Sequence, residues 1–580
     1  MQNNLHAFDH GGLAADVCSL ETENSGVYVY EICFRAAQSP ALLEWEMPML
    51  DIAGLWHPCC GMDRGIKADW YSPVKNMTSR SAPVMTFYNS CGFNRCTFSL
   101  SEIRKEHRIY AGVHEEDGTL HIRIQIPLDG QQDYRLFLRI DHRELRYCEV
   151  LHDVVNWWQK CGVTALPTPE SSWEPVYSTW YAWHQEMHGD ALVEECRRAA
   201  TLGMRTIIID DGWQTADNNR GYAYCGDWRV EPGKFPDLRK TVSQIHKLGM
   251  KCMMWFSVPY VGIHAGVWTQ FSDKLLTYNP NNGAGVLDPR YPQVREYLIG
   301  TYERFLREYG LDGMKLDFID EFHMWPESPV FAEGMDCRDV QTAVNRLMSD
   351  VISRLQAIRP EVMIEFRQPY IGPGIWEYGN MFRAEDCPNS ELYNRVKTLD
   401  LRLLMGPSAV HSDMLMWHQD ESAEAVSRQI IACIFSVIQF SVRLDRIDQR
   451  KQKMLKWWIG FMEKNRKLLL HSPLEPMEPQ NLYPLVVAET GHVGIVALYL
   501  ANQVVTWKTA WDYGFILNGV GVGEVFFSPE AVGCYRITLR DCCGEAVQDL
   551  KLECSAGQIC RLPLPAGGCA EIESDIIKVS

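Results

Sequence analysis

The hydrophobic pattern divides the chain into three stretches. Up to about residue 165, short runs alternate hydrophobic and polar residues, and turn-forming segments such as EEDGT separate them. A period of two is typical of strands with one buried face. The clearest runs lie at 27–34, 95–103, 120–128 and 134–140. This stretch predicts an N-terminal β-sandwich domain, which we place at residues 1–168.

The middle stretch has a different rhythm. Strand-length hydrophobic runs alternate with amphipathic segments, such as 191–203 and 291–310, in which apolar residues recur every three to four positions. Eight such runs can be counted, at 176–183, 205–213, 251–259, 313–320, 362–369, 380–387, 407–414 and 439–445. Eight strand-helix repeats over nearly 300 residues are typical of a (β/α)8 TIM barrel. We place this barrel domain at 169–475, and the Pro-, Ser- and Thr-rich segment 164–175 is predicted to be the linker before it.

The last stretch returns to short runs separated by glycine-rich turns, at 485–490, 494–500, 524–528 and 534–540. It predicts a small C-terminal β-sandwich at 476–580. The predicted fold class is therefore α/β, with a central barrel between two β-sandwiches.

Charged residues interrupt the fourth barrel run at its end, in the segment GLDGMKLDFIDEF (310–322). Lys315 and Asp317 are two residues apart, so on a strand they project to the same side. A charge without a partner in the barrel core would be costly, whereas the C-terminal ends of barrel strands line the active-site mouth. A buried ion pair without function is the alternative.

Similar residues recur at the other predicted strand ends. They are Trp180 in the first run, Asp210, Asp211 and Trp213 in the second, Trp255 in the third, Glu365 and Arg367 in the fifth, Arg383 and Asp386 in the sixth, and His411 and Asp413 in the seventh. Carboxylates accept hydrogen bonds from sugar hydroxyls, basic side chains donate to them, and tryptophan faces stack on sugar rings. The pattern therefore predicts a pocket for a polyhydroxylated ligand.

Two carboxyl groups on either side of an anomeric carbon can cleave a glycosidic bond. Asp317 is the predicted nucleophile, because the neighbouring Lys315 keeps it ionised. Asp386 is the predicted acid, on the opposite side of the bond. Asp413 is an alternative acid, while Glu385 is expected to point to the other side of its strand.

Composition narrows the partners and the cell compartment. A formal net charge of −18 with scattered basic residues argues against a nucleic-acid partner. No signal-like N-terminus and no apolar run of 18 residues occur, which predicts a cytoplasmic protein without a membrane partner. Among the 20 cysteines, vicinal pairs such as Cys59–Cys60 fit reduced thiols. The 19 tryptophans and 24 tyrosines suit sugar binding or a large aromatic core.

Four segments, taken in order, resemble one known family. They are IIIDDGWQ (207–214), GDWRVEPGKFPDL (226–238), LGMKCMMWF (248–256) and DGMKLDF (312–318). Together they resemble glycoside hydrolase family 36, the melibiase or α-galactosidase family, which is related to α-N-acetylgalactosaminidases and raffinose synthases. The resemblance covers about residues 170–450.

The resemblance implies roles for individual residues. It implies that Asp317 is the nucleophile and that Asp386, within 380–396, is the acid/base group. It also implies that Asp210, Asp211, Trp213 and Lys315 bind the terminal sugar. A covalent glycosyl-enzyme intermediate, retention of configuration, and the absence of a metal or other cofactor follow from the family's chemistry.

Two segments depart from the family pattern. They are WFSVPYVG (255–262) in place of a Phe-Glu-Pro-Glu segment, and EFRQPYIGPG (365–374) in place of a Cys-Ser-x-Gly-Gly-Gly-Arg stretch. Both contribute to the pocket wall in the family, so the resemblance supports the chemistry more directly than the identity of the sugar. The N-terminal domain is also shorter than in tetrameric members, so a homo-oligomer is possible but not implied.

The sequence thus predicts a retaining exo-α-glycosidase that removes terminal α-linked galactose from small oligosaccharides. An α-N-acetylgalactosaminidase, another α-glycosidase or transglycosidase of the same fold, and a non-catalytic sugar-binding protein remain alternatives. A metal-dependent hydrolase is disfavoured, because the histidines near strand ends (His184, His411 and His418) are too sparse for a metal site.

Overall fold

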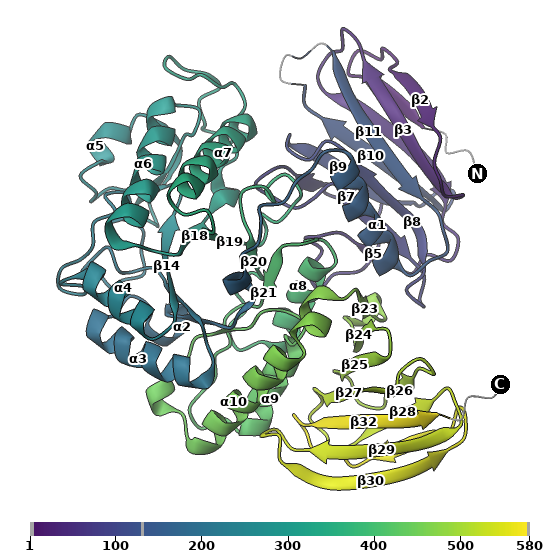
Figure 1. The fold of residues 1–580 in the computed structure, drawn as a ribbon. Helices are drawn as coiled ribbons and strands as arrows, with labels where there is room; N and C mark the ends of the chain where they lie inside the picture. The colour runs from purple at the N-terminus through teal and green to yellow at the C-terminus, as the bar shows by residue number, and fades with distance from the viewer. Residues whose placement is uncertain (1–4, 129–130, 132, 577–580) are drawn as a thin grey trace.

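The computed structural model describes residues 5–576 apart from 129, 130 and 132, and its centre is an eight-stranded parallel sheet (Figure 1). The strands are β12 (Val176–Ser178), β13 (Thr206–Ile209), β14 (Lys251–Ser257), β18 (Gly313–Asp317), β19 (Met363–Arg367), β20 (Met381–Arg383), β21 (Ala409–His411) and β22 (Gln439–Phe440). They pair in chain order, and β22 also pairs with β12. Parallel bridges from His411 to Val437 and from Leu415 to Phe440 join β21 to the β22 segment and close the barrel. The predicted fold class is confirmed.

Each of the eight predicted runs contains one of these strands, but the strands are shorter than the runs. The first run forms a strand for three residues and then turns into the short helix α2 (Trp180–Trp183). Trp180 therefore lies on a helix and not on a strand as predicted. The ends of the runs leave the sheet because the chain there lines the mouth of the barrel instead of its hydrogen-bonded wall.

Local sequence signals set the bounds of the barrel helices. The main ones are α3 (Gly189–Leu202), α4 (Leu238–Lys247), α6 (Pro292–Tyr309), α7 (Val340–Ile358), α8 (Glu391–Arg402), α9 (Ala423–Ala432) and α10 (Gln449–Lys464). Asp237, Asp339 and Ser390 each accept a hydrogen bond from a backbone N–H in the first turn of the helix that follows. Gly203 and Gly310 end α3 and α6 in the left-handed conformation, which glycine adopts without strain.

Two antiparallel sheets precede the barrel. The first has the order β1 (His6–Asp9), β4 (Ala41–Pro48), β10 (Thr119–Ile126), β9 (His107–His114), β6 (Val74–Asn76), and the second the order β2 (Asp16–Leu20), β3 (Val27–Phe34), β11 (Tyr134–Asp141), β8 (Asn94–Leu100), β7 (Val84–Tyr88), β5 (Gly54–Trp56). Inward-facing residues of both sheets form one core, in which the rings of Trp45 and Phe98 meet edge to face at 5.0 Å. Helix α1 (Tyr147–Lys160) follows these sheets and packs against β7 and β8.

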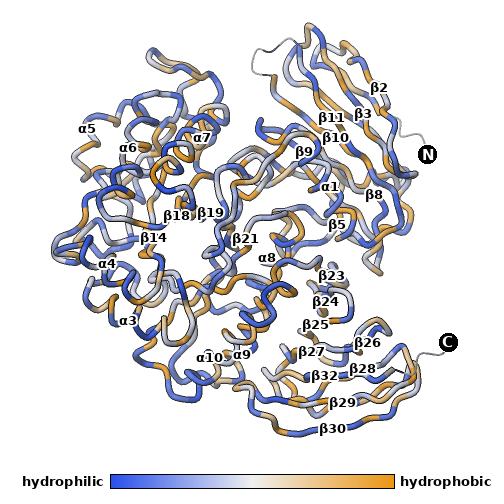
Figure 2. Tube along the Cα trace, in the orientation of Figure 1, coloured by the Kyte–Doolittle hydropathy of each residue, from blue (hydrophilic) through white to orange (hydrophobic). Residues whose placement is uncertain are grey.

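The chain ends in a seven-stranded and a three-stranded sheet. The larger sheet has the order β23 (Leu474–Pro476), β24 (Leu485–Thr490), β25 (Val493–Leu498), β27 (Tyr513–Asn518), β32 (Cys569–Ile576), β29 (Gly533–Arg540), β30 (Ala546–Cys554), and the smaller one the order β26 (Val504–Trp507), β28 (Val525–Pro529), β31 (Cys560–Leu562). Strand β30 at the sheet edge is mostly exposed and carries hydrophilic residues (Figure 2). Such residues discourage pairing with another chain.

The N-terminal sheets contact the barrel close to its mouth. The backbone N–H of Ser81 donates to the carbonyl of Pro369, in the loop after β19, at 2.8 Å. A Cβ placed on Gly372 of the same loop would lie 2.0 Å from the Ser81 carbonyl oxygen, so this approach requires glycine. The N-terminal part of the chain therefore fixes the path of the strand-five loop.

The predicted linker is packed and not free. Ser172 is buried, and its carbonyl accepts a hydrogen bond from Nε2 of His411 in the barrel at 2.9 Å. A small sheet of β15 (Tyr260–Gly262), β17 (Ala284–Leu287) and β16 (Leu275–Asn279) follows β14 and was not predicted, because its strands are too short to show a clear period. Among the described helices, none is long and apolar enough to cross a membrane.

Candidate active site

Asp317 lies at the C-terminal end of β18 and is the most heavily bonded carboxylate of the mouth. Its Oδ1 accepts hydrogen bonds from Nε of Arg367 at 2.7 Å, the backbone N–H of Phe318 at 2.8 Å and the hydroxyl of Tyr370 at 3.1 Å. Its Oδ2 accepts one from Nε1 of Trp255 at 3.0 Å. Four donors on one carboxylate fix its position and favour its charged form.

The electrostatic surroundings of Asp317 favour the same form. Burial raises the pKa of this carboxyl, but the charges of Arg367 and Lys315 and the hydrogen bond from Trp255 together hold the pKa well below its usual value. The residue is 6% exposed. The surroundings of this buried carboxylate thus favour its ionised form, and Arg367 acts on it more strongly than Lys315, to which the sequence analysis attributed the effect.

Lys315 bonds to a different aspartate than its neighbour in sequence. Its Nζ donates to Oδ2 of Asp210, at the end of β13, at 2.7 Å, and both side chains are buried. Burial lowers the pKa of Lys315, but the charge of Asp210 and other carboxylates raises it overall. Lys315 thus acts on Asp317 through its charge and, with Asp210, places a donor and an acceptor beside it.

Asp211 and Trp213 contact other residues than Asp210, Lys315 and Asp317 do. The two oxygens of Asp211 accept hydrogen bonds from the amides of Gln185 and Gln214, each at 2.7 Å, and burial raises the pKa of Asp211 to about 6. Trp213 is fully buried and packs edge to face on Phe305 of α6 at 5.0 Å. The structure therefore brings Asp210 to Lys315 and Asp317, but it places Trp213 in the packing between barrel and helices.

Arg383, at the end of β20, connects three carboxylates. Its guanidinium bonds to Oδ1 of Asp413, and its second terminal nitrogen lies 2.8 Å from Oδ1 of Asp386. Its Nε is 3.7 Å from Oε1 of Glu365. Glu365 is fully buried, which raises its pKa to about 7, and it accepts a hydrogen bond from Nε2 of Gln439 at 2.5 Å.

Asp386 and Asp413 differ in their access to solvent. The side chain of Asp386 is 50% exposed, whereas that of Asp413 is fully buried. Asp413 also accepts hydrogen bonds from the Tyr181 hydroxyl at 3.0 Å and the backbone N–H of Cys387 at 2.7 Å. Asp413 is thus saturated by protein donors, while Asp386 has an open side.

Opposing effects act on the protonation of Asp386. Partial burial in the mouth raises its pKa, the charges of Arg383 and Lys315 lower it, and the charge of Asp317 raises it; the net direction is down. The parallel strands β18 and β20 end at the same side of the barrel, and the charges of Lys315 and Asp317 both act on this carboxyl. A group that covered Asp386 and displaced its water would move its pKa back up.

Aromatic rings line the side of Asp317 away from β20. Phe318 follows it directly in the left-handed conformation, with φ of 67°, which is uncommon for a bulky residue. Its ring lies 5.0 Å from Tyr260 and 5.2 Å from Tyr222, whose own rings stack at 4.9 Å. Trp180, half-buried on α2, meets the ring of His184 at 4.9 Å.

Two of the histidines named in the sequence analysis, His411 and His418, have different surroundings. His411 is buried, which lowers its pKa to about 3, and its Nε2 is engaged by the Ser172 carbonyl. His418 is exposed and lies near Asp420. Within the part of the chain that the structure describes, the cluster of potential metal ligands lies in the N-terminal sheets instead.

Several residues of the site were not predicted from the sequence. Tyr370, Tyr181, Gln185 and Gln214 hold Asp317, Asp413 and Asp211 in place, and all four come from loops or from the short segment after β12. Gln214 lies in the quoted segment IIIDDGWQ, so its position next to the aspartates was a usable signal. Tyr370 gave none, because its contact depends on the course of the loop after β19.

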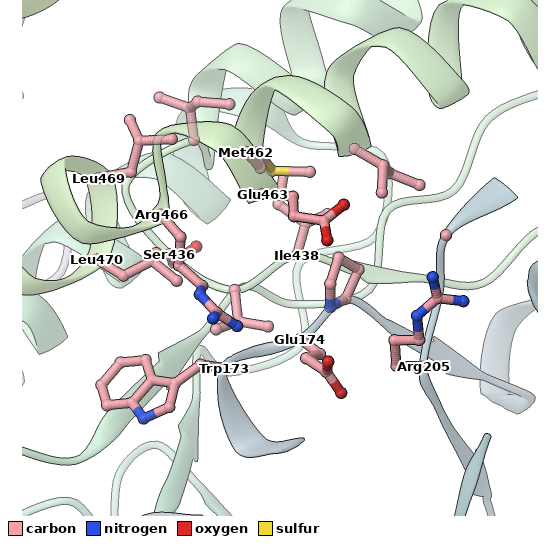
Figure 3. Close-up of a pocket in the computed structure, with 15 residues that line it drawn as sticks. Trp173, Glu174, Arg205, Ser436, Ile438, Met462, Glu463, Arg466, Leu469 and Leu470 are labelled. Carbon is pink, nitrogen blue, oxygen red and sulfur yellow. The ribbon is translucent and has the colours of Figure 1, made fainter. Parts of the chain in front are cut away.

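A pocket at the opposite end of the barrel is unrelated to this group (Figure 3). It is lined by Trp173, Glu174, Arg205, Ile438 and Arg466, among others. Arg205 and Ile438 immediately precede β13 and β22, so the pocket lies at the N-terminal ends of the strands. Barrel enzymes place their chemistry at the other end.

Comparisons with known proteins agree with this arrangement. An α-galactosidase from Escherichia coli is 28% identical over 160 residues, covering 26% of this chain and 22% of that protein. The α-galactosidase AgaA from Geobacillus stearothermophilus is 22% identical over 345 residues, covering 56% and 46%. The matched part thus spans less than half of either curated relative.

The solved structure of AgaA in complex with raffinose shares the fold. It superimposes with a TM-score of 0.66 at 14% identity and covers 97% of this chain and 82% of that one. The barrel together with its flanking sheets is therefore an arrangement known from family 36. A model of the melibiase family matches residues 170–471, more than half of the chain and the whole of the barrel described above. The chain belongs to the melibiase family, glycoside hydrolase family 36.

Proposed function

We propose that this protein is a retaining exo-α-glycosidase that removes terminal α-linked galactose, or a closely related sugar, from small oligosaccharides. The observation that carries the proposal is Asp317, a buried carboxylate held ionised by four donors at the mouth, with the half-exposed Asp386 facing the same region. A carboxylate that is fixed and charged is what a nucleophile at an anomeric carbon requires.

In the first step, an oxygen of Asp317 attacks the anomeric carbon and the glycosidic C–O bond breaks. Asp386 gives its proton to the leaving oxygen, so the aglycone departs as a neutral alcohol. In the second step, Asp386 takes a proton from water, the water oxygen attacks the same carbon, and Asp317 is released. Two displacements return the original α-configuration.

The protonation states of the two carboxyls fit a shared cycle. A sugar bound over Asp386 excludes water and raises the pKa of this carboxyl, so it can hold the proton for the first step. Once Asp317 is bonded to the sugar, its negative charge is gone, and the pKa of Asp386 falls. Asp386 is then the base that activates water.

Asp210, Lys315, Arg367 and Arg383 supply acceptors and donors for sugar hydroxyls in this proposal. Lys315 Nζ and Asp210 Oδ2 are 2.7 Å apart, so a sugar hydroxyl that lies beside this pair can accept from Lys315 and donate to Asp210. Trp255 supports the nucleophile through its indole N–H. We propose a hydrogen-bonding role for Asp211 through Gln185 and Gln214, which occupy its oxygens in this structure.

The proposal is tested with p-nitrophenyl α-glycosides of galactose, N-acetylgalactosamine, glucose and xylose, with the β-galactoside as a control. Release from the α-galactoside in wild type, and none in Asp317→Ala, is the expected result. Release from another α-glycoside would assign a different sugar to the same chemistry. Release from none of them, with binding of oligosaccharides in calorimetry, would contradict the enzyme and identify a sugar-binding protein.

A further inference from the structure

A cluster of two histidines and an aspartate lies in the N-terminal sheets, away from the barrel mouth. Asp69 precedes β6, His114 ends β9, and His121 lies in β10. One potential ligand atom from each lies within 4.8 Å of the other two. In the antiparallel pair of β9 and β10, His114 lies opposite Thr119. Thr119 is two residues before His121, so the imidazoles of His114 and His121 are diagonal neighbours on one face of the sheet.

Both rings turn a nitrogen toward the same carboxylate oxygen. Oδ2 of Asp69 lies 2.8 Å from Nδ1 of His114 and 3.2 Å from Nδ1 of His121. The rings are stacked, with centroids 4.3 Å apart and planes within 9°. The outer nitrogens also face carboxylates, with Nε2 of His114 3.2 Å from Glu116 and Nε2 of His121 3.5 Å from Glu46.

The three carboxylates around the two rings favour positive charge at this position. A neutral imidazole has one N–H and one lone pair, so each neutral ring would turn a lone pair toward a carboxylate. Two imidazolium ions would satisfy all four nitrogens, but they would stack charge on charge. A divalent cation relieves both problems, since it binds the imidazole lone pairs and neutralises the three carboxylates.

We propose that Asp69, His114 and His121 form a binding site for a divalent transition metal ion of the zinc class, with Glu46 and Glu116 beside it. Imidazole nitrogens and a carboxylate oxygen are ligands that such ions use in proteins. The two histidine side chains are each 34% exposed and that of Asp69 is 23% exposed, so an ion can reach them.

The surrounding structure permits the small adjustment that binding needs. The two ring planes are nearly parallel, and an ion must lie in the plane of each ligating ring, so the rings must rotate toward each other. A surface recess lined by Glu44, Glu46, Asp69 and His121, among others, leaves space on one side. The backbone N–H of Asp69 donates to the carbonyl of Val113, so the backbone positions are already linked.

A metal at this position would tie the segment before β6 to the β9–β10 hairpin. The structure gives it no part in the barrel chemistry, so its effect belongs to the stability of the N-terminal sheets. A ligand that binds the folded form raises the melting temperature, and the stabilisation grows with the logarithm of the ligand concentration relative to its dissociation constant. The site is therefore detectable in both binding and stability.

The test uses the full chain, freed of metal with a chelator and kept reduced. Calorimetric titration with Zn²⁺ is expected to show one more bound equivalent in wild type than in the His114→Ala/His121→Ala variant. Zn²⁺ bound by the free cysteines contributes equally to both titrations, so it cancels in this difference. His492→Ala, which removes an exposed histidine of the C-terminal sheets, is the matched control and should keep the wild-type stoichiometry. Zn²⁺ should raise the melting temperature of wild type more than that of the double variant.

A second probe separates this site from the thiols. Co²⁺ bound by imidazole and carboxylate gives ligand-field bands without thiolate charge transfer, and these bands should disappear in Asp69→Asn and in the double variant. Glu46→Gln should weaken binding by roughly 10-fold to 100-fold if it orients His121. Equal Zn²⁺ stoichiometry in wild type and the double variant, or Co²⁺ spectra that show thiolate ligation alone, would overturn the proposal.

Discussion

Asp317 ends β18 and Asp386 lies three residues after β20, on the two sides of β19, yet the protein surrounds them in opposite ways. Asp317 is 6% exposed, and it accepts hydrogen bonds from four donors, which lie in β14, in the residue after β18, in β19 and in the loop after β19. The side chain of Asp386 is 50% exposed, and among the described residues its bonded partner is Arg383. One carboxylate is held by four donors, and the other is bonded on one side and open to solvent on the other.

The difference matches the two tasks in the proposed mechanism. A nucleophile must stay charged and aimed at one carbon, so donors that fix it also serve the reaction. An acid/base group must exchange protons with a leaving oxygen and with water, so a full set of protein donors would hinder it. Asp413 is saturated by donors without solvent access, and it therefore suits the positioning of Arg383 better than proton transfer.

Removing the nucleophile should have the largest effect. Asp317→Ala is expected to lower hydrolysis of the α-glycoside by at least about 1,000-fold, because the first covalent step has no substitute. Asp317→Asn is the matched control for shape, since it can still accept hydrogen bonds, and it should be as inactive. Circular dichroism should show that both variants keep the fold. Turnover above one tenth of the wild-type value in either variant would remove Asp317 from this role.

Replacing the acid should give a loss that depends on the leaving group. For Asp386→Ala, hydrolysis of an oligosaccharide should fall by roughly 100-fold to 10,000-fold, because the departing sugar needs a proton. The first step with the p-nitrophenyl glycoside should suffer much less, because the nitrophenolate leaves without protonation. Added azide should then speed turnover by replacing the activated water.

Asp413→Asn sharpens the same comparison. It should lower activity toward both kinds of substrate alike and reduce the melting temperature, because it disturbs the buried contact with Arg383. If instead this variant showed the leaving-group dependence and Asp386→Ala did not, the acid would be Asp413.

Arg383 should control the pH at which the acid works. Its charge lowers the pKa of Asp386, and the first step requires Asp386 protonated, so the rate is lost as pH rises through that pKa. In Arg383→Gln the pKa of Asp386 should be higher, so the alkaline limb of the pH–rate profile should shift to higher pH by roughly 1 pH unit. Arg383→Lys keeps the charge and should keep the limb near its wild-type position. If the alkaline limb stayed at the same pH in Arg383→Gln, the group that titrates there would not be Asp386.

Sequence reasoning succeeded where local pattern decides the outcome. The period of the hydrophobic runs located all eight barrel strands, and the two-residue spacing placed Lys315 and Asp317 on one side of β18. Carboxylates at strand ends then followed from the rule that a charge avoids the barrel core. These signals involve neighbours in sequence, so they needed no knowledge of packing.

It fell short where the outcome depends on distant contacts. The hydrogen-bond partner of Lys315 is Asp210, not Asp317. The distance between Lys315 and Asp210 is set by the register of β13, β14 and β18, which the sequence does not reveal. Trp213 was expected at the mouth but packs on Phe305, after the chain turns at Gly212 with φ of 111°. No local pattern encodes where such a turn sends the next side chain.

Tyr370 is the weakest of the four donors to Asp317, and its removal should have the smallest effect. Tyr370→Phe deletes one hydrogen bond of 3.1 Å to a charged carboxylate, worth about 1.5 kcal/mol, and should lower kcat/KM by roughly 10-fold. Tyr378→Phe, on the same loop but bonded to Asn345, should leave the rate unchanged. The pKa of Asp317 should remain well below its usual value, because Arg367, Lys315 and Trp255 still act on it. A loss as large as in Asp317→Asn would mean that the tyrosine hydroxyl takes part in the reaction itself. The contrast between Asp317, held by four donors, and the solvent-exposed Asp386 would then no longer account for the site.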